Sequence, residues 1–221
     1  MISLIKRLPF IRNYTSSHWE KWWEKRQIDW KEHYLKTWNH PHRFVITNIL
    51  KSVNWMSLLE VGSGPGANLV NIVKQIEGRQ LGGIDINPEA IEMAGKILQG
   101  GFFKVCPVHD LMMSDSSVDI ILSDMTLIYY GPHRIHKALE EIKRVARNYV
   151  LLSEFHSNSF IDRWRLRLSS GLHSYNYKDL LQKHGFYDII LIKMPKEAWP
   201  EADIEKDKFR YILLAKVPKR K

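Results

Sequence analysis

The chain has 221 residues, of which 44% are hydrophobic and 26% are charged, so it can bury a core of its own and is not a disordered protein. Its formal net charge of +9 favours anionic partners such as nucleic acid, phosphorylated or carboxylated metabolites, or acidic lipid. No apolar run approaches the roughly 18 residues that a membrane span needs, and a single cysteine, Cys106, suits a reducing compartment, so we expect a cytoplasmic protein without a disulfide or a metal site.

The first fifty residues form an aromatic-rich segment. Residues 1–12 mix apolar and basic side chains, which predicts a frayed or packed leading segment, with a membrane-surface contact as the alternative. From residue 16 to residue 38, most aromatic side chains recur at the three, four or seven residue steps of one or two amphipathic helices; the tryptophans are Trp19, Trp22, Trp23, Trp30 and Trp38. Their face either packs as ordinary core or closes over a ligand. We interpret residues 1–50 as a helical lid and residues 51–221 as the main domain.

The main domain reads as alternating strands and helices. A helix is expected over residues 43–53, after His40-Pro41, and further helices over 67–77, from Asn87-Pro88 onward, and over 132–146 and 176–184. Strands are expected over residues 57–61, 81–86, 102–108, 118–123, 149–154, 187–193 and 209–217. These mostly continuous apolar strands predict a Rossmann-like α/β fold, with a mostly parallel seven-stranded sheet between two layers of helices. No helix is expected between the last two strands, so the last strand should run antiparallel.

A glycine-rich turn follows the first strand. Gly62, Gly64 and Gly66 let backbone amides approach a ligand closely, but their spacing fits a dinucleotide site as well as other adenosine cofactors. Asp85, at the end of the second strand, can accept hydrogen bonds from both hydroxyls of a ribose, whether the cofactor is a dinucleotide or another adenosine compound. Glu60, just ahead of the glycines, would repel a pyrophosphate and attract a ligand that carries an ammonium group. The sequence therefore favours an aminated adenosine cofactor.

The same residues resemble the successive cofactor motifs of class I S-adenosylmethionine-dependent methyltransferases. The resemblance lies in residues 59–66, 83–88 and 108–111, and it continues through 118–124 and 140–145 in the same order. It implies a seven-stranded sheet with its last strand antiparallel, and S-adenosylmethionine as the cofactor. Glu60 would hold the methionine amine, Asp85 the ribose hydroxyls and Asp110 the adenine amine. The other cofactor contacts expected are Gly62, Ser63, Gly64 and Gly66 of the turn, with Ile86, His109, Leu111 and Ser123.

A substrate pocket is expected beyond the carboxyl ends of the fourth and fifth strands. A base is needed there only if the accepting atom carries a proton. The candidate catalytic residues are Asp124, His133 and His156, and the candidate substrate-binding residues include Tyr129, Tyr130 and Glu154. Residues 162–168 interleave arginines with a tryptophan, so Trp164 and Arg165 could stack on a ring and clamp a carboxylate or phosphate. A solvated basic loop is the alternative for this segment.

The predicted function is transfer of a methyl group from S-adenosylmethionine to an oxygen or nitrogen, or less readily a carbon, of a small anionic or aromatic metabolite. The basic surface keeps a tRNA or other RNA substrate as the alternative, although no Asp-Pro-Pro-Tyr type signature follows the fourth strand. A nicotinamide-dependent oxidoreductase, for which the sequence lacks a Tyr-x-x-x-Lys pair, and a binding module without transferase activity are the alternatives from other classes.

Overall fold

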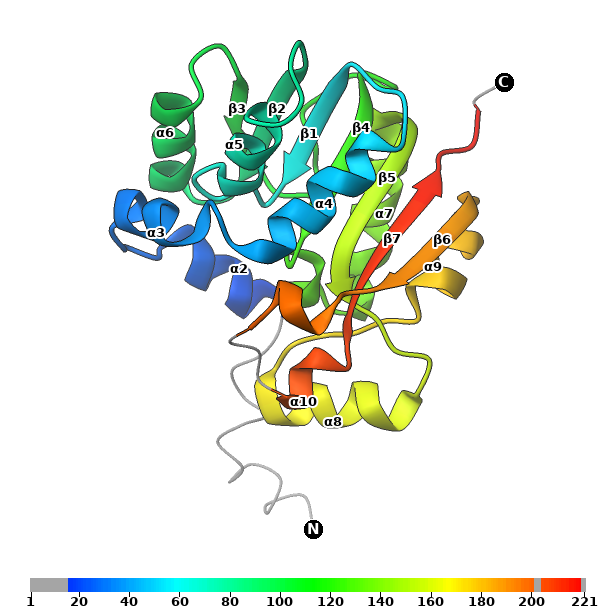
Figure 1. Cartoon of the computed structure of the whole chain (residues 1–221). Helices are drawn as coiled ribbons and strands as arrows, with labels where there is room; N and C mark the ends of the chain where they lie inside the picture. The colour runs from blue at the N-terminus through cyan, green and yellow to red at the C-terminus, as the bar shows by residue number, and fades with distance from the viewer. Residues whose placement is uncertain (1–15, 201–203, 220–221) are drawn as a thin grey trace.

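A seven-stranded sheet forms the centre of the protein, whose computed structural model describes residues 16–200 and 204–219 (Figure 1). Its strands are β1 (Ser57–Val61), β2 (Gln80–Asp85), β3 (Phe102–Val105), β4 (Val118–Asp124), β5 (Ala146–Phe155), β6 (Tyr187–Lys193) and β7 (Arg210–Lys216). The order across the sheet is β3-β2-β1-β4-β5-β7-β6, and β7 runs antiparallel to both of its neighbours. The other pairs are parallel, which confirms the expected fold class and the antiparallel last strand.

Helices cover both faces of the sheet because alternate strand residues enter two different cores. Leu58 of β1 packs in a cluster with Ile46 of α4 (Pro41–Lys51) and Leu69 of α5 (Ala67–Val73). The next residue, Leu59, points to the opposite face and joins a cluster with Leu139 of α7 (Pro132–Val145) and residues of α9 (Tyr177–Lys183). This two-sided burial is the pattern of a parallel sheet between helical layers.

The N-terminal aromatic segment forms two helices, α2 (Ser16–Glu24) and α3 (Trp30–Thr37), which lie near the carboxyl ends of the parallel strands (Figure 1). Asn87 joins this segment to the main domain. Its side-chain oxygen accepts a hydrogen bond from the Ala90 amide at the start of α6 (Pro88–Ile97), 3.0 Å away. Its side-chain nitrogen donates to the carbonyls of Trp23 and Arg26 at 2.8 and 2.9 Å. One buried side chain thus both caps a helix and holds the end of α2.

Several elements differ from the sequence expectations. The third strand ends at Val105 rather than at residue 108, since Pro107 has no amide to donate to a sheet. Helix α4 begins at Pro41, with His40 as its N-cap, instead of at residue 43. The segment for which a basic loop was the alternative belongs to α8 (Phe160–Ser170). The Ser159 hydroxyl accepts from the Asp162 amide at the start of this helix, and Gly171, with a φ of 72°, ends it.

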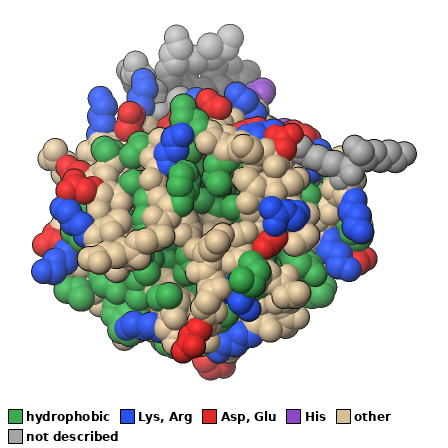
Figure 2. Space-filling view, turned by 90° about the horizontal axis from the view of Figure 1, so that it is seen from above, with side chains coloured by type: hydrophobic (Ala, Val, Ile, Leu, Met, Phe, Trp, Pro, Cys, Tyr) green, Lys and Arg blue, Asp and Glu red, His purple; other side chains and the backbone are tan. Residues whose placement is uncertain are grey.

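The remaining elements are short. They are η1 (Leu127–Tyr129), η2 (Lys196–Ala198) and α10 (Ile204–Asp207), of which the last two lie between β6 and β7. The leading segment at residues 1–12, with its expected packing or membrane contact, lies outside the described residues. Within the described ranges, none of the helices combines the length and the apolar character that crossing a membrane requires. Viewed from above, lysines and arginines are spread among acidic and apolar side chains rather than gathered in one patch (Figure 2).

Candidate functional site

A cavity of about 490 Å³ lies where the parallel strands end, a volume within the usual range for small-molecule sites. The turn after β1 and the end of β2 line one part of it, and residues after β4 line another. Further parts of its wall come from α2, α3, the start of α4 and the segment that leads into β7. Residues far apart in the sequence therefore meet around one space.

The glycine turn forms the floor at the β1 end. Gly62 and Gly64 have φ angles of 70° and 51°, which strain any residue with a side chain. A Cβ atom at Gly62 would overlap the side chain of Thr126. Both the backbone conformation and the lack of space therefore require glycine at this position. Asp85 accepts hydrogen bonds from the amides of Gly64 and Asn87, each at 2.9 Å, and thereby ties the turn to the end of β2. Burial raises the pKa of Asp85, while these backbone hydrogen bonds oppose that rise.

Three buried polar side chains lie side by side next to the turn. The Asn68 side-chain nitrogen donates to Glu60 Oε1 at 2.6 Å and to Asp124 Oδ2 at 3.0 Å. Burial raises the pKa of Glu60 to about 8, despite the opposing Asn68 hydrogen bond. The second oxygens of Glu60 and Asp124 and the Asn68 oxygen have no hydrogen-bond partner among the described residues. Three unsatisfied acceptors in one cavity wall fit a cationic ligand group such as an ammonium.

Asp124 also receives two basic side chains from the start of α4. His42 Nε2 lies 2.9 Å from Asp124 Oδ2, and Arg43 Nη1 lies 3.4 Å from the same oxygen. Burial alone would raise the pKa of Asp124, but His42 and Arg43 outweigh it and hold the pKa below its ordinary value. The second ring nitrogen of His42, Nδ1, lies 2.6 Å from Nδ1 of His40. Asp124 is therefore an ionised carboxylate at the inner end of a row of two histidines.

Aromatic side chains enclose the cavity. Tyr129 of η1 packs against Trp19 and Trp23 of α2, with ring centroids 5.1 and 5.5 Å apart. Burial raises the pKa of Tyr129 to about 12, so its hydroxyl stays protonated at neutral pH. At the other end, the Trp199 ring lies 4.1 Å from the His42 ring, and the Arg210 guanidinium lies 4.4 Å from the Trp199 ring. The cavity lining thus combines acidic side chains with aromatic and cationic ones, which meet where Asp124 contacts His42 and Arg43.

The cavity brings together nine of the residues that the sequence predicts for the site. They are Glu60, Gly62, Ser63, Gly64, Asp85, Ile86, Asp124, Tyr129 and Tyr130. Tyr130 has a further structural contact, because its hydroxyl accepts a hydrogen bond from the Val108 amide at 3.2 Å. Burial raises its pKa well above the ordinary range for tyrosine.

Glu154 and Ser123 do not line the cavity but support it from beneath. Glu154 Oε1 accepts from the Ser123 hydroxyl at 2.7 Å and from the amides of Thr126 and Leu127 at 3.0 Å each. Glu154 Oε2 accepts from the Ile128 amide at 3.2 Å. The carboxylate thus holds the turn that carries Tyr129, in place of the expected substrate contact. Its burial raises the pKa to about 7, and the hydrogen bonds that it accepts oppose this rise.

Two of the three histidine and carboxylate candidates for catalysis lie elsewhere. His133 is exposed on the first turn of α7 and does not line the cavity. His156 is buried, and its Nδ1 accepts a hydrogen bond from the Tyr177 amide at 3.1 Å. Burial lowers the pKa of His156. Both histidines were candidates because each follows the end of a strand. Neither side chain contributes to the cavity wall.

The remaining expected residues also lie outside the cavity lining. Trp164 and Arg165 are exposed on α8, where the Trp164 side chain keeps 55% of its surface accessible. Asp110 is exposed, whereas Leu111 is in the core and its amide donates to Glu141. His109 and Gly66 complete this set: His109 Nε2 lies 3.9 Å from Glu20 of α2, and Gly66 is the N-cap of α5.

Sequence reasoning missed most of the polar residues that face the cavity. They include His40, His42, Arg43, Asn68 and Arg210, with Trp199 beside them. Asn68 interrupts the apolar face of a helix that follows a glycine turn, which is a signal of a buried polar role. The His40-Pro41-His42-Arg43 run concentrates basic groups at a helix start, but His42 reaches Asp124 across 82 positions in the sequence. Such a pairing exists only in the folded protein.

Comparisons with known proteins bear on this arrangement. Residues 59–152 match a family model described as a methyltransferase domain. A methyltransferase from Haloferax volcanii, solved in complex with the Trm112 methyltransferase activator, aligns at a TM-score of 0.64 and 17% identity over 90% of this chain and 97% of its own. An S-adenosylmethionine-dependent methyltransferase from Thermotoga maritima aligns at a TM-score of 0.63 and 16% identity, over 90% and 98%.

Geranyl diphosphate C-methyltransferase from Streptomyces coelicolor A3(2), solved with S-adenosyl-L-homocysteine, aligns at a TM-score of 0.63 and 12% identity. That alignment covers 79% of this chain and 76% of the other. Comparison with curated proteins gives no match. At these identities, the likeness to solved structures concerns the fold.

Proposed function

We propose that this chain, a class I S-adenosylmethionine-dependent methyltransferase, transfers the methyl group to an oxygen or nitrogen atom of a small anionic or aromatic metabolite. The observation that carries this proposal is one cavity whose lining combines acidic side chains beside the glycine turn, which we treat as its acidic end, with aromatic and cationic side chains around Trp199, which we treat as its other end. S-adenosylmethionine supplies a methyl group bound to a positively charged sulfur, which a nucleophile can attack in line. The protein has to bind both reactants, align them and exclude water.

The acidic end is suited to the cofactor. Glu60 and Asn68 offer unsatisfied oxygens for the methionine ammonium. Asp85 accepts from the backbone amides of Gly64, Asn87 and Ile86, and a carboxylate with about four acceptor sites keeps capacity for a ribose hydroxyl. Ile86 lines the same end and offers an apolar surface to the adenine. We assign cofactor binding to these residues and to the Gly62–Gly64 turn.

The aromatic helices are suited to covering the bound reactants, and we propose that residues 1–50 act as a lid. Trp23 and Trp30 line the cavity, and the ion pair between Glu20 and Arg134 joins α2 to α7. Aromatic side chains cover a large area at a small cost in conformational entropy. Alignment of reactants in a closed, dry site can contribute as much as roughly 7 to 11 kcal/mol to lowering a barrier.

The other end of the cavity is suited to an anionic or aromatic acceptor. Trp199 provides a ring for stacking, while Arg43 and Arg210 provide positive charge. These features favour a small anionic or aromatic metabolite as the acceptor.

Two measurements test the proposal. Titration calorimetry should detect binding of S-adenosylhomocysteine, and reduced nicotinamide dinucleotide should not compete. Incubation with cofactor labelled in its methyl group, together with separate pools of small metabolites, total RNA and peptides, should label the metabolite pool. Labelling of RNA alone would overturn the substrate class, and competition by the nicotinamide would overturn the cofactor assignment.

A further inference from the structure

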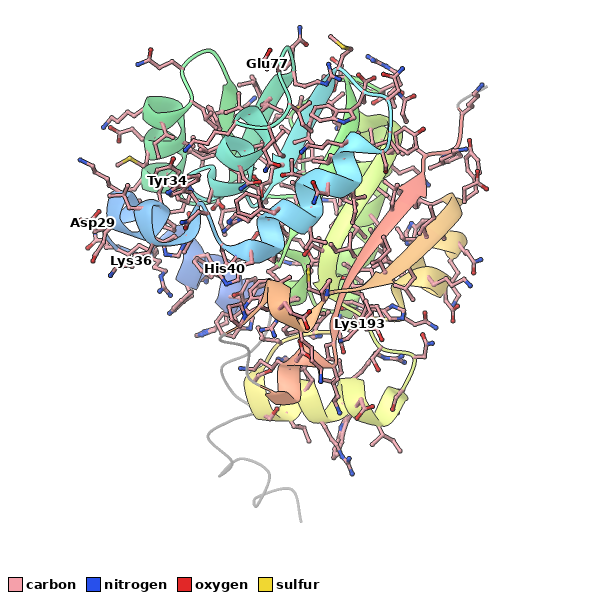
Figure 3. The ribbon with its side chains drawn as sticks, in the orientation of Figure 1. Asp29, Tyr34, Lys36, His40, Glu77 and Lys193 are labelled. Atoms are coloured by element: carbon pink, nitrogen blue, oxygen red, sulfur yellow. The ribbon has the colours of Figure 1, made fainter. Side chains whose placement is uncertain are left out.

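Two histidines and an aspartate form a hydrogen-bonded row along the cavity wall. His40 lies at the junction of α3 and α4 (Figure 3), and its Nδ1 is 2.6 Å from Nδ1 of His42. His42 Nε2 is 2.9 Å from Asp124 Oδ2. His40, His42 and Asp124 all line the cavity, and both His42 and Asp124 are buried within it. We call these three residues the His40 row.

The bonding partners fix which nitrogens carry protons when both histidines are neutral. Asp124 is ionised and can only accept, so His42 Nε2 carries a hydrogen. His42 Nδ1 then has a lone pair and must receive a hydrogen from His40 Nδ1. It follows that Nε2 of His40 is left with a lone pair. An unprotonated imidazole nitrogen in a cavity wall is the group that a general base requires.

We propose that His40 is the catalytic base of the methyl transfer and that the acceptor is an aromatic hydroxyl. This inference rests on the proposed function. As the acceptor oxygen forms its bond to the methyl carbon, the carbon–sulfur bond breaks and its electron pair stays on sulfur. The O–H bond breaks as well, and its proton goes to His40 Nε2. The proton on His40 Nδ1 can then pass to His42 Nδ1, which leaves the positive charge on His42 beside Asp124.

The row matters because His40 alone would hold a proton poorly. Burial lowers the pKa of His40 to about 4, a positive charge on His42, when present, and the charges of Arg43 and Arg210 act in the same direction, and only Asp124 opposes them. Transfer of the proton from His40 to His42 places the positive charge on the His42 ring, whose Nε2 lies 2.9 Å from the Asp124 carboxylate. His42 and Asp124 are thus positioning residues, because they act on the acceptor through His40.

The residues around the His40 row indicate the chemical class of the acceptor. Trp199 lines the cavity and its ring lies 4.9 Å from the His40 ring and 4.1 Å from the His42 ring, so an aromatic compound bound beside His40 would meet other aromatic rings. Arg43 and Arg210 would stabilise a phenolate oxygen and repel an alkylammonium group. A thioether acceptor has no proton to lose and would not need His40.

The substitution His40→Asn removes the proposed base while it keeps the structural roles of the side chain. The asparagine amide can still donate from about the position of Nδ1, but it has no atom at Nε2. His40 is also the N-cap of α4 and makes no side-chain cap hydrogen bond, and asparagine is a favoured residue at that position. His136→Gln, at an exposed site on α7, serves as the matched control.

The probe is 4-nitrophenol, whose phenolate absorbs visible light whereas its neutral form does not. Added to the complex with S-adenosylhomocysteine at pH 6, it should show more than fivefold more phenolate than free 4-nitrophenol does. The excess should persist in His136→Gln and disappear in His40→Asn. Equal ionisation in His40→Asn, or no binding of 4-nitrophenol in the presence of S-adenosylhomocysteine, would overturn the proposal. Failure of S-adenosylhomocysteine itself to bind would instead overturn the proposed function.

Nitrogen NMR of ¹⁵N-labelled histidines gives a readout that does not depend on any acceptor. In the wild-type complex with S-adenosylhomocysteine at pH 7, His40 should be protonated at Nδ1 and His42 at Nε2. In Asp124→Asn, the His42 signal should report altered protonation, and the phenolate excess should fall at least tenfold while the thermal unfolding midpoint of the complex shows a folded protein. A His40 ring protonated at Nε2 and bare at Nδ1 in the wild type would refute the assignment.

Discussion

Replacing the buried carboxyl of Glu60 with an amide should stabilise the cofactor-free protein and do so more at high pH. Burial raises the pKa of Glu60 from 4.5 to about 8. The folded protein therefore binds this proton more tightly than the unfolded chain, so stability is highest below pH 4.5 and falls as the pH rises toward 8. Glu60→Gln removes this dependence, because an amide does not ionise in that range.

The magnitude follows from the size of the shift. Each pKa unit corresponds to about 1.4 kcal/mol, so the ionised carboxyl costs at most about 5 kcal/mol above pH 8. About 2 kcal/mol of this cost develops between pH 6 and pH 8. For a chain of this length, each 1 kcal/mol moves the unfolding midpoint by roughly 2 to 4 °C. The stabilisation by Glu60→Gln should accordingly be about 4 to 8 °C larger at pH 8 than at pH 6.

The same carboxyl should make cofactor binding depend on pH in the opposite sense. An ammonium group beside Glu60 favours the ionised form, so binding releases a proton below pH 8. The affinity of the wild type for S-adenosylhomocysteine should rise about tenfold from pH 6 to pH 7, since one pKa unit corresponds to about 1.4 kcal/mol. Glu60→Gln should bind more weakly at pH 8 and show little change with pH.

Thermal unfolding at pH 6, 7 and 8, and calorimetry in two buffers with different ionisation heats, measure these effects. Glu92→Gln is the matched control, because Glu92 is exposed and pairs only with Lys96 at the surface. It should leave the unfolding midpoint and its pH dependence essentially as in the wild type, because a surface ion pair contributes little to stability. A wild type that binds S-adenosylhomocysteine equally at pH 6 and pH 8, without proton release, would refute the placement of the ammonium beside Glu60.

Three further substitutions test the cofactor end and the lid. Asp85→Ala should weaken S-adenosylhomocysteine binding at least tenfold by calorimetry, and unchanged affinity would remove this carboxylate from the site. Gly62→Ala should lower the unfolding midpoint and abolish binding, because the new methyl meets Thr126 at a φ of 70°; a folded variant with normal affinity would contradict that geometry. Asn87→Ala should cost about 1 to 2 kcal/mol in urea unfolding and expose α2 to limited proteolysis, since it removes a helix cap and two hydrogen bonds to that segment. Unchanged proteolysis would mean that other contacts hold α2.

The sheet could be predicted from the sequence because its signals are local. The signals of the buried strands, the glycine turn and the Asn87-Pro88 helix start each span only a few consecutive residues. The structure confirms the elements that they predict. The helix α8 has local signals too, in the Ser159 cap and Gly171, but its exposed apolar residues lack the one-sided pattern of a packed helix.

The candidate site was harder to predict, because it depends on directions and on contacts between distant segments. Residues of the turn and strand ends, such as Glu60 and Asp85, could be found from their motif alone. His133 and His156 follow the same strand-end logic but leave the backbone on other sides. The histidines at the start of α4 carry no motif, and their role arises only when that helix packs beside Asp124.

The two ends of the cavity come from different stretches of the chain. The proposed cofactor end is built almost wholly within residues 59–152, whereas His40, His42 and Arg43 precede that stretch and Trp199 and Arg210 follow it. On this proposal, acceptor preference can change through the flanking stretches while the residues assigned to the methyl donor stay the same. For enzyme engineering, exchanging residues 40–43 together with 196–210 is a rational route to new acceptors on an unaltered donor-binding core.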